Sequence, residues 1–397
     1  MEEKLFNKGF IAVTSINFIV YLVYYLMMVI IAVIAHEELH ASFGQAGVAS
    51  GIYIIGTLVA RLIVGKELEL VGRRQIARWG AVFYLVTTIA YLFVPNILVL
   101  DTVRLLNGFA YGMTSTALNA IVTDFIPDNR RGEGINYYGL STSLAAAIGP
   151  FVGLMLLNAT SFHFIVLLSV ALIAAAMVAL FMIKITNVTL TDAHRQALKS
   201  WQISSFVEYK VGLIAVIGFL MGLSYSSVLA FLASYAESLN LVAVSSFFFV
   251  VYAGIVTITR PMSGRIFDRF GENMVMYPSY IFLTIGLIIL GLTHHGVTLL
   301  LSGAFIGLGY GTFMSNGQAV TLKLVSARRI GIALSTYFIG LDLGLGVGPY
   351  AFGALHAYVP FRDLYFIAAI IPLISAILYY FFYRPAKRQI AADGLVN

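Results

Sequence analysis

The sequence has no cysteine and few charged residues. Of its 397 residues, 11% are charged and 60% are hydrophobic, whereas soluble domains carry about 25% charged residues. The absence of cysteine excludes a disulfide framework and a thiolate metal site. The shortage of charge excludes an ordinary soluble globular domain, so we expect a membrane protein.

Long apolar runs make up most of the chain. A helix needs about 20 mostly apolar residues to cross a bilayer. Runs of this length lie near residues 10–35, 43–65, 77–95, 98–124, 135–157, 163–184, 211–236, 241–263, 274–293, 296–324, 330–357 and 362–383. We therefore predict an all-α polytopic membrane protein with 12 transmembrane helices. The first run is too long for the apolar part of a signal peptide, so we expect it to be retained as a span.

Lysine and arginine are sorted between the two sides of these spans. Twenty of the 24 basic residues fall in the termini and in alternate loops, and the opposite loops hold only Arg362. Because positive charge stays on the cytoplasmic side, we predict a multi-pass protein of the cell membrane with both termini in the cytoplasm. The net charge of +6 then reflects topology, and no nucleic-acid partner is expected.

The two halves of the chain repeat each other. A shift of 199 residues aligns Tyr53 with Tyr252, Arg61 with Arg260, Gly65 with Gly264, Glu69 with Asp268, Gly72 with Gly271, Tyr111 with Tyr310, and Gly149-Pro150 with Gly348-Pro349. We predict two parallel six-helix pseudo-repeats, at 1–184 and 210–397, joined by a cytoplasmic linker at 185–209. Parallel repeats of this kind rock against each other around a site at the midplane of the membrane.

The loop after the second span, Gly65-Lys66-Glu67-Leu68-Glu69-Leu70-Val71-Gly72-Arg73-Arg74, resembles the G-x-x-x-D-x-x-G-R-R loop of the major facilitator superfamily. Within the superfamily, the chain resembles the twelve-helix drug:proton antiporters of the bacterial multidrug efflux type, over nearly its whole length. The resemblance implies a conformational latch formed by Gly65, Glu69, Gly72, Arg73, Arg74 and Asp124, with a weaker version at Asp268 and Arg269. The alternative is a basic loop that only sets the topology.

The fourth span contains Arg104 followed by Gly108, which resembles the antiporter pattern R-x-x-x-G. An arginine inside a span costs about 2.5–3.5 kcal/mol, so we expect Arg104 to face the cavity and to pair with Asp101 or Asp342. The predicted role is proton-linked electrostatics. The alternative is an arginine that reaches outward to Asp101 at the membrane interface.

The fifth span contains Gly149-Pro150-Phe151-Val152-Gly153, which resembles the antiporter signature G-P-x-x-G-G with Leu154 in place of the last glycine. Proline kinks a helix, and glycine allows close packing. We predict helix hinges at Gly149, Pro150, Gly153, Gly348 and Pro349. Within the superfamily the signature marks exporters, so the resemblance favours antiport.

Asp342 is the one acid among 18 that lies deep within a predicted span. A carboxylate there is costly unless it is protonated, paired or hydrated. These alternatives suit an exchange of a proton for a cationic substrate, and we predict proton coupling by Asp342 with Arg104 and Asp101. A fixed structural pair of Asp342 with Arg104 or with hydroxyl groups is the alternative.

Aromatic and amide side chains within the spans are candidates for the substrate cavity, because aromatic rings bind bulky and cationic compounds. The candidates are Asn17, Tyr21, Tyr24, Asn107, Tyr111, Tyr225, Tyr310, Asn316 and Tyr337. Tyrosine is also common at membrane interfaces, so each could be structural instead. No metal site is expected, because the histidines of the external loops are interpreted as solvated.

We predict proton-coupled efflux of small amphipathic or cationic compounds by alternating access. The alternatives are a dedicated exporter of one metabolite, such as a sugar or a metal-chelating small molecule, and then a proton symporter for uptake. No nucleophile motif, phosphate loop or metal cluster indicates an enzyme. The expected partners are a small-molecule substrate, protons and the lipid bilayer, and the chain is expected to act as a monomer without a cofactor.

Overall fold

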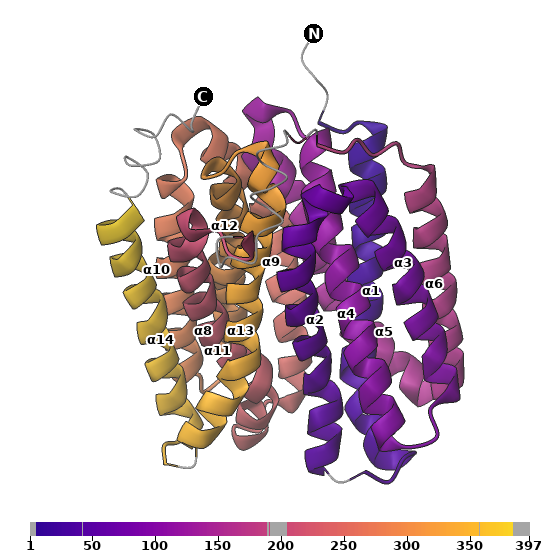
Figure 1. The fold of residues 1–397 in the computed structure, drawn as a ribbon. Coiled ribbons are helices and arrows are strands. Elements are labelled where there is room, and N and C mark those ends of the chain that lie inside the picture. The colour runs from indigo at the N-terminus through magenta and orange to yellow at the C-terminus, as the bar shows by residue number, and fades with distance from the viewer. Residues whose placement is uncertain (1–4, 42, 189, 191–204, 357, 384–397) are drawn as a thin grey trace. The chain divides into compact units, whose positions relative to one another are not determined.

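The computed structural model describes residues 5–41, 43–188, 190, 205–356 and 358–383. Most of the predicted linker 185–209 lies outside the described residues. The described part is helical and contains no strand, and Figure 1 shows its long helices. They divide into two compact units.

Unit 1 comprises Met1–Pro127, Leu144–Val207 and Ala327–Ser335. Its helices are α1 (Lys8–Glu37), α2 (Phe43–Val71), α3 (Arg73–Ala90), α4 (Ile97–Ile121), the second part of α5 (Arg131–Ala159) and α6 (Phe162–Met182). Helices α2 and α4 are in close contact, because a methyl group added at Gly112 would lie 2.8 Å from the carbonyl oxygen of Thr57. Glycine thus lets the two helix backbones approach each other.

Unit 2 comprises Asp128–Ser143, Glu208–Ser326 and Thr336–Asn397. Its helices are α8 (Gly212–Ser238), α9 (Val242–Phe270), α10 (Asn273–Gly291), α11 (Gly296–Ile306), α12 (Thr312–Lys323), α13 (Ile330–His356) and α14 (Phe361–Leu378). A π-helical turn, η6 (Gly307–Gly311), joins α11 to α12 in one continuous segment. Turns of this kind are frequent at functional sites.

The two units differ from a division of the chain by sequence. The start of α5, in Asp128–Ser143, packs with unit 2, and the start of α13, in Ala327–Ser335, packs with unit 1. The two segments begin one 199-residue repeat apart. Each unit therefore contains the first turns of one helix whose remainder belongs to the other unit.

The part of the chain that the structure describes contains twelve long helical segments, counting α11 through α12 as one. Ten are long and apolar enough to cross a membrane, namely every long segment except α2 and α4. The predicted all-α polytopic fold is confirmed. The two that do not qualify, α2 and α4, pack against each other inside unit 1.

Two glycines of the repeat adopt a backbone conformation that other residues avoid. Gly72, before α3, has φ +106°, and Gly271, after α9, has φ +87°. A residue with a β-carbon in this region costs about 1–3 kcal/mol. These two turns explain why glycine recurs at both positions.

Replacing Gly271 by alanine is expected to lower the free energy of unfolding by about 1–3 kcal/mol through backbone strain alone. An added methyl group at Gly271 meets nothing within 4 Å. Gly254→Ala is the matched control, because Gly254 also has open space but lies within α9, where alanine is favourable. Thermal unfolding in detergent should show a lower midpoint for Gly271→Ala only, and equal midpoints would contradict the assignment of strain.

Candidate functional site

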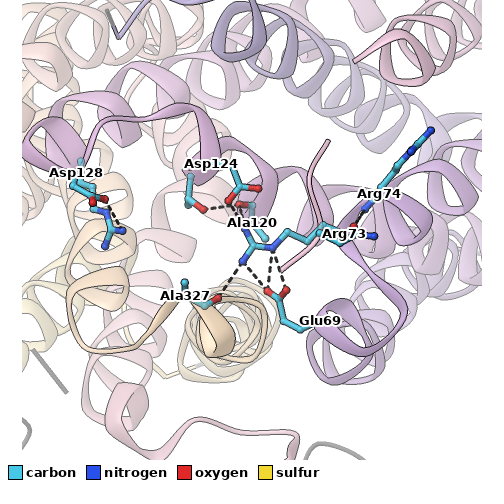
Figure 2. Close-up of polar contacts among 10 residues, drawn as sticks. Glu69, Arg73, Arg74, Ala120, Asp124, Asp128 and Ala327 are labelled. Atoms are coloured by element: carbon cyan, nitrogen blue, oxygen red, sulfur yellow. Dashed lines mark hydrogen bonds and ion pairs between the residues drawn. The ribbon is translucent and has the colours of Figure 1, made fainter. Parts of the chain in front are cut away.

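Arg73, the first residue of α3, is the centre of a buried ionic cluster in unit 1 (Figure 2). Its side chain is 0% exposed. Its Nη2 lies 2.8 Å from Oε1 of Glu69, and its Nη1 lies 2.7 Å from Oδ1 of Asp124. The guanidinium also donates to the carbonyl oxygens of Ala120 and Ala327, both at 3.2 Å. One planar fork thus joins α2, α4 and the segment that precedes α13.

The same cluster holds the first turn of α13. Glu69 accepts a hydrogen bond from the backbone of Gly331, and a methyl group added at Gly331 would lie 3.2 Å from the carbonyl oxygen of Gly65. Burial outweighs the attraction of Arg73 and raises the pKa of the Glu69 and Asp124 carboxyls, which lie at the ends of their helices. We call Gly65, Glu69, Arg73, Asp124 and Gly331 the Arg73 cluster.

The structure thus brings together four of the predicted latch residues, Gly65, Glu69, Arg73 and Asp124, and gives Gly72 the turn that precedes Arg73. The second basic residue of the predicted latch differs, because Arg74 is exposed and points away from the cluster in Figure 2. Its backbone N–H donates to Asn187 at 3.1 Å.

In unit 2, Asp268 occupies the position equivalent to Glu69 and holds the start of α5. Its Oδ1 and Oδ2 accept from the backbone N–H groups of Gly132 and Glu133, both at 2.8 Å. A methyl group added at Gly264 would lie 2.7 Å from both the Gly132 carbonyl oxygen and the Glu133 Cα. We call Gly132, Glu133, Gly264 and Asp268 the Asp268 cluster. A carboxylate at a helix N-terminus is favourable.

Glu133 adds ion pairs at the edge of the Asp268 cluster. Its Oε2 lies 2.6 Å from Nη2 of Arg130, and its Oε1 lies 2.9 Å from Nε of Arg265. The predicted latch residue Arg269 is exposed, and Arg265, one helical turn earlier on α9, makes the ion pair. Sequence reasoning did not single out Glu133 or Arg265, although Glu133 directly follows Gly132, which a shift of 199 residues aligns with Gly331.

Three buried polar side chains form a closed triangle next to the Asp268 cluster. Nδ2 of Asn136 donates to Oδ1 of Asn316 at 3.0 Å, Nδ2 of Asn316 donates to Oγ of Ser263 at 3.2 Å, and this hydroxyl donates to Oδ1 of Asn136 at 3.2 Å. The triangle connects α5, α9 and α12. The side-chain amide of Asn316, a predicted substrate ligand, is therefore hydrogen-bonded to other residues of unit 2.

Arg104 lies deep within unit 1, at 0% exposure. Its Nε donates to the carbonyl oxygen of Ala49 at 2.9 Å, and its guanidinium lies 4.4 Å from the ring centroid of Tyr53. Its Nη1 also donates to the hydroxyl of Tyr91 at 3.4 Å. Asp101, the predicted partner, has a buried Oδ1 without a hydrogen-bond partner among the described residues.

The ring of Tyr53, which the Arg104 guanidinium contacts, belongs to a cluster of tyrosine rings in unit 1. Tyr24 stacks on Tyr111 at 4.7 Å and on Tyr53 at 5.2 Å, and Tyr21 meets Tyr111 edge-on at 5.4 Å. The structure therefore brings three predicted cavity residues, Tyr21, Tyr24 and Tyr111, into one aromatic cluster. Such a cluster offers stacking surface to aromatic compounds.

Asn107 has a different environment. Its Nδ2 donates to the hydroxyls of Thr87 and Thr88 at 2.9 and 3.2 Å, and its Oδ1 accepts from Tyr91 at 3.3 Å. Tyr91 in turn lines a cavity of about 240 Å³ in unit 1, which Glu38 also lines. Asn107 thus supports Tyr91 from inside the unit, while its role as a substrate ligand stays a prediction.

Unit 2 contains a matching but smaller aromatic stack. Tyr225 stacks on Tyr310 at 4.0 Å and on Tyr252 at 5.7 Å. Tyr310 belongs to the π-helical turn η6, whereas the equivalent Tyr111 lies in the regular α4. The hydroxyl of Tyr337 donates to the carbonyl oxygen of Met314 at 2.8 Å.

The remaining predicted residues lie within helices. Asn17 is fully buried in α1, and Asp342 is half-buried in α13. Gly149, Pro150 and Gly153 lie in α5, and Gly348 and Pro349 lie in α13. A methyl group added at Gly149 would lie 2.7 Å from Cβ of Tyr25, so this glycine is a contact point between α5 and α1. The proton-coupling and hinge roles stay predictions.

Comparisons with known proteins agree on one family. The profile of the Major Facilitator Superfamily matches residues 13–298 and 214–394. The chain is 22% identical over 363 residues to an uncharacterised MFS-type transporter of Methanocaldococcus jannaschii, covering 87% of this chain and 90% of that protein. It is 30% identical over 187 residues to the multidrug resistance protein MdtG of Citrobacter koseri, covering 45% of each chain.

Two crystal structures share the fold. The human organic anion transporter MFSD10 matches with a TM-score of 0.74 at 15% identity, covering 93% of this chain and 98% of that one. The transporter FucP in its outward conformation matches with a TM-score of 0.73 at 15% identity, covering 95% and 99%. With membrane-spanning helices, an internal repeat and these matches, the chain is a multi-pass membrane protein that belongs to the major facilitator superfamily of transporters.

Proposed function

We propose that this transporter exports small amphipathic or cationic compounds in exchange for protons. It works by alternating access in the cell membrane, with both termini in the cytoplasm. In this proposal the Arg73 and Asp268 clusters fasten the form that is closed to the cytoplasm, and both clusters open when the transporter turns inward.

The observation that carries the proposal is that both units contain the same kind of contact between a carboxylate and the first turn of a helix. Each cluster joins an acid after a repeat glycine to the first turn of a helix, through Glu69 to Gly331 and through Asp268 to Gly132. Hydrogen bonds and glycine contacts of this kind can break and reform without loss of covalent structure. A permanent structural core would gain more from apolar packing than from buried ions.

The substrate class is supported by three features of the chain and its relatives. The tyrosine clusters offer stacking and cation–π surface. The multidrug resistance proteins named MdtG match under half of the chain. The Gly149-Pro150 signature resembles that of exporters. A dedicated exporter of one metabolite is the alternative.

Reconstituted transporter in proteoliposomes tests the proposal. An imposed proton gradient should drive uphill movement of lipophilic cations and amphipathic compounds, because a proton crossing 100 mV yields about 2.3 kcal/mol, or roughly a fiftyfold gradient. Movement of one sugar or one chelator alone would favour the dedicated exporter. Transport that ignores the proton gradient would overturn the coupling.

Replacing Asp342 by asparagine is expected to lower proton-driven accumulation about tenfold or more, because the amide cannot carry a proton through the cycle. Downhill exchange of substrate should persist. Asp363→Asn is the matched control, because Asp363 is an exposed acid in the first turn of α14. Uphill accumulation by Asp342→Asn at the wild-type level would exclude Asp342 as the coupling residue.

A further inference from the structure

The Arg73–Asp124 ion pair has a counterpart in the second half with its charges reversed. A shift of 199 residues places Glu272 at the position of Arg73 and Lys323 at the position of Asp124. Nζ of Lys323 lies 3.4 Å from Oε2 of Glu272, and Nη1 of Arg73 lies 2.7 Å from Oδ1 of Asp124. Position and partnership are repeated, but polarity is inverted.

The inverted pair is firmly held within unit 2. Glu272 is 5% exposed, and its Oε1 accepts from the hydroxyl of Tyr383 at 3.2 Å. The ammonium of Lys323 lies 4.1 Å from the ring centroid of Phe267, on the last turn of α9. Hydrogen bonds from an ammonium and a hydroxyl favour the charged form of a carboxyl group.

The inversion changes the partner of the acid four residues earlier. Both oxygens of Glu69 accept hydrogen bonds from Arg73, and the Oε1 atom lies 2.8 Å from Nη2. The carboxyl is therefore shared between this arginine and the backbone of Gly331. Asp268 has a carboxylate, Glu272, at the same spacing. Position 272 thus offers Asp268 a carboxylate where the first half offers a cation, and both oxygens of Asp268 bind backbone N–H groups of α5 instead.

We propose that Glu272, held by Lys323, is a positioning residue that directs Asp268 onto α5 and makes the Asp268 cluster the stronger of the two fastenings. The inference rests on the proposed function in that both clusters fasten the form closed to the cytoplasm. It has an unusual consequence. An arginine at position 272, as in the first half of the chain, weakens the closure because it draws Asp268 away from Gly132 and Glu133.

A cysteine probe can measure this closure, because the chain has no cysteine of its own. Ser315 on α12 is 2% exposed, and a methyl group added at Gly139 on α5 would lie 2.8 Å from its Oγ. In a Ser315→Cys background, the thiol stays covered while the start of α5 is in place. The rate of maleimide labelling in inside-out vesicles therefore reports how often the start of α5 moves away from this thiol.

The comparison has five variants in this background. Asp268→Asn and Glu272→Arg should each raise the labelling rate about tenfold, the equivalent of 1.4 kcal/mol. Glu69→Gln and Glu272→Gln should raise it about threefold at most. The double variant Glu272→Arg with Lys323→Asp rebuilds an ion pair of the first half's polarity, and its labelling should stay about tenfold high because the arginine still competes for Asp268.

The double variant separates positioning from simple structural support. If Glu272 only supplied an ion pair, Lys323→Asp would restore the closed form and wild-type labelling, which would overturn the inference. The double variant also conserves the net charge of the pair. It can therefore test the inference even where the single Glu272→Arg variant does not fold. Equal labelling of Glu272→Arg and Glu272→Gln would overturn the inference as well. Unchanged labelling in both Asp268→Asn and Glu69→Gln would instead overturn the proposed closing role of the clusters.

Discussion

Replacing Arg73 by alanine should open the closure that we propose for the cytoplasmic side and stop transport. The guanidinium is fully buried and contacts four groups from α2, α4 and the segment before α13. Removing it leaves Glu69 and Asp124 without their shared cation. Loss of one partner from a buried ionic group costs about 3–5 kcal/mol, which lowers the ratio of closed to open forms roughly a hundredfold or more.

Labelling of a Ser335→Cys probe would measure this opening. Ser335 is 0% exposed, at the start of α13, and a methyl group added at Gly65 would lie 2.6 Å from its Cβ. Arg73→Ala should therefore label much faster than the background protein. Arg73→Lys should be intermediate, because one ammonium cannot replace a fork that reaches several acceptors.

Arg74→Ala is the matched control for Arg73→Ala. The two residues are adjacent and equally charged, but the Arg74 side chain is exposed and lies outside the cluster (Figure 2). A topogenic role of the loop would make the two variants alike, because each removes one positive charge from it. Wild-type labelling by Arg73→Ala, or equal effects of the two variants, would thus favour the topogenic interpretation.

The fold could be predicted well from the sequence because its signals are local. Apolar runs mark the helices, and the 199-residue repeat marks the halves. The Arg73 cluster was also within reach, since the loop resemblance names Glu69, Arg73 and Asp124. Ion pairs between side chains can be predicted in this way, because the residue types and their spacing are visible in the sequence.

The second cluster was harder to predict because its partners are backbone groups. Asp268 binds the N–H groups of Gly132 and Glu133, and any residue supplies such a donor. The exchange of helix starts between units has no sequence signature either.

The π-helical turn illustrates a third limit of sequence reasoning. The segments 108–112 and 307–311 both begin and end with glycine and share a tyrosine, yet only the second is π-helical. The segments differ at their second and third residues, and at the third, Gly309, an added methyl group would lie 2.7 Å from Cα of Leu283. A close contact with α10, rather than a local preference, therefore accompanies the altered turn.

Replacing Gly264 by alanine should separate the start of α5 from α9. The added methyl group would lie 2.7 Å from the Gly132 carbonyl oxygen and the Glu133 Cα, and 3.0 Å from the Glu133 nitrogen. These are backbone atoms, so no side-chain rotation relieves the contact. Overpacking of this kind costs about 1–3 kcal/mol, and displacement of α5 also lengthens both hydrogen bonds of Asp268. The closed form should therefore lose roughly a hundredfold in population.

Gly254→Ala is the control, because it adds the same methyl group to the same helix where nothing lies within 4 Å. It should leave the closure intact and stabilise α9 slightly, since alanine favours a helix by about 1 kcal/mol over glycine. In the Ser315→Cys background, Gly264→Ala should label about a hundredfold faster than Gly254→Ala. Similar rates in the two variants would mean that α9 and α5 do not need this contact to close the transporter. The closed form would then depend on the hydrogen bonds and ion pairs of unit 2, because the contact of Gly264 is the part of the Asp268 cluster that depends on close packing.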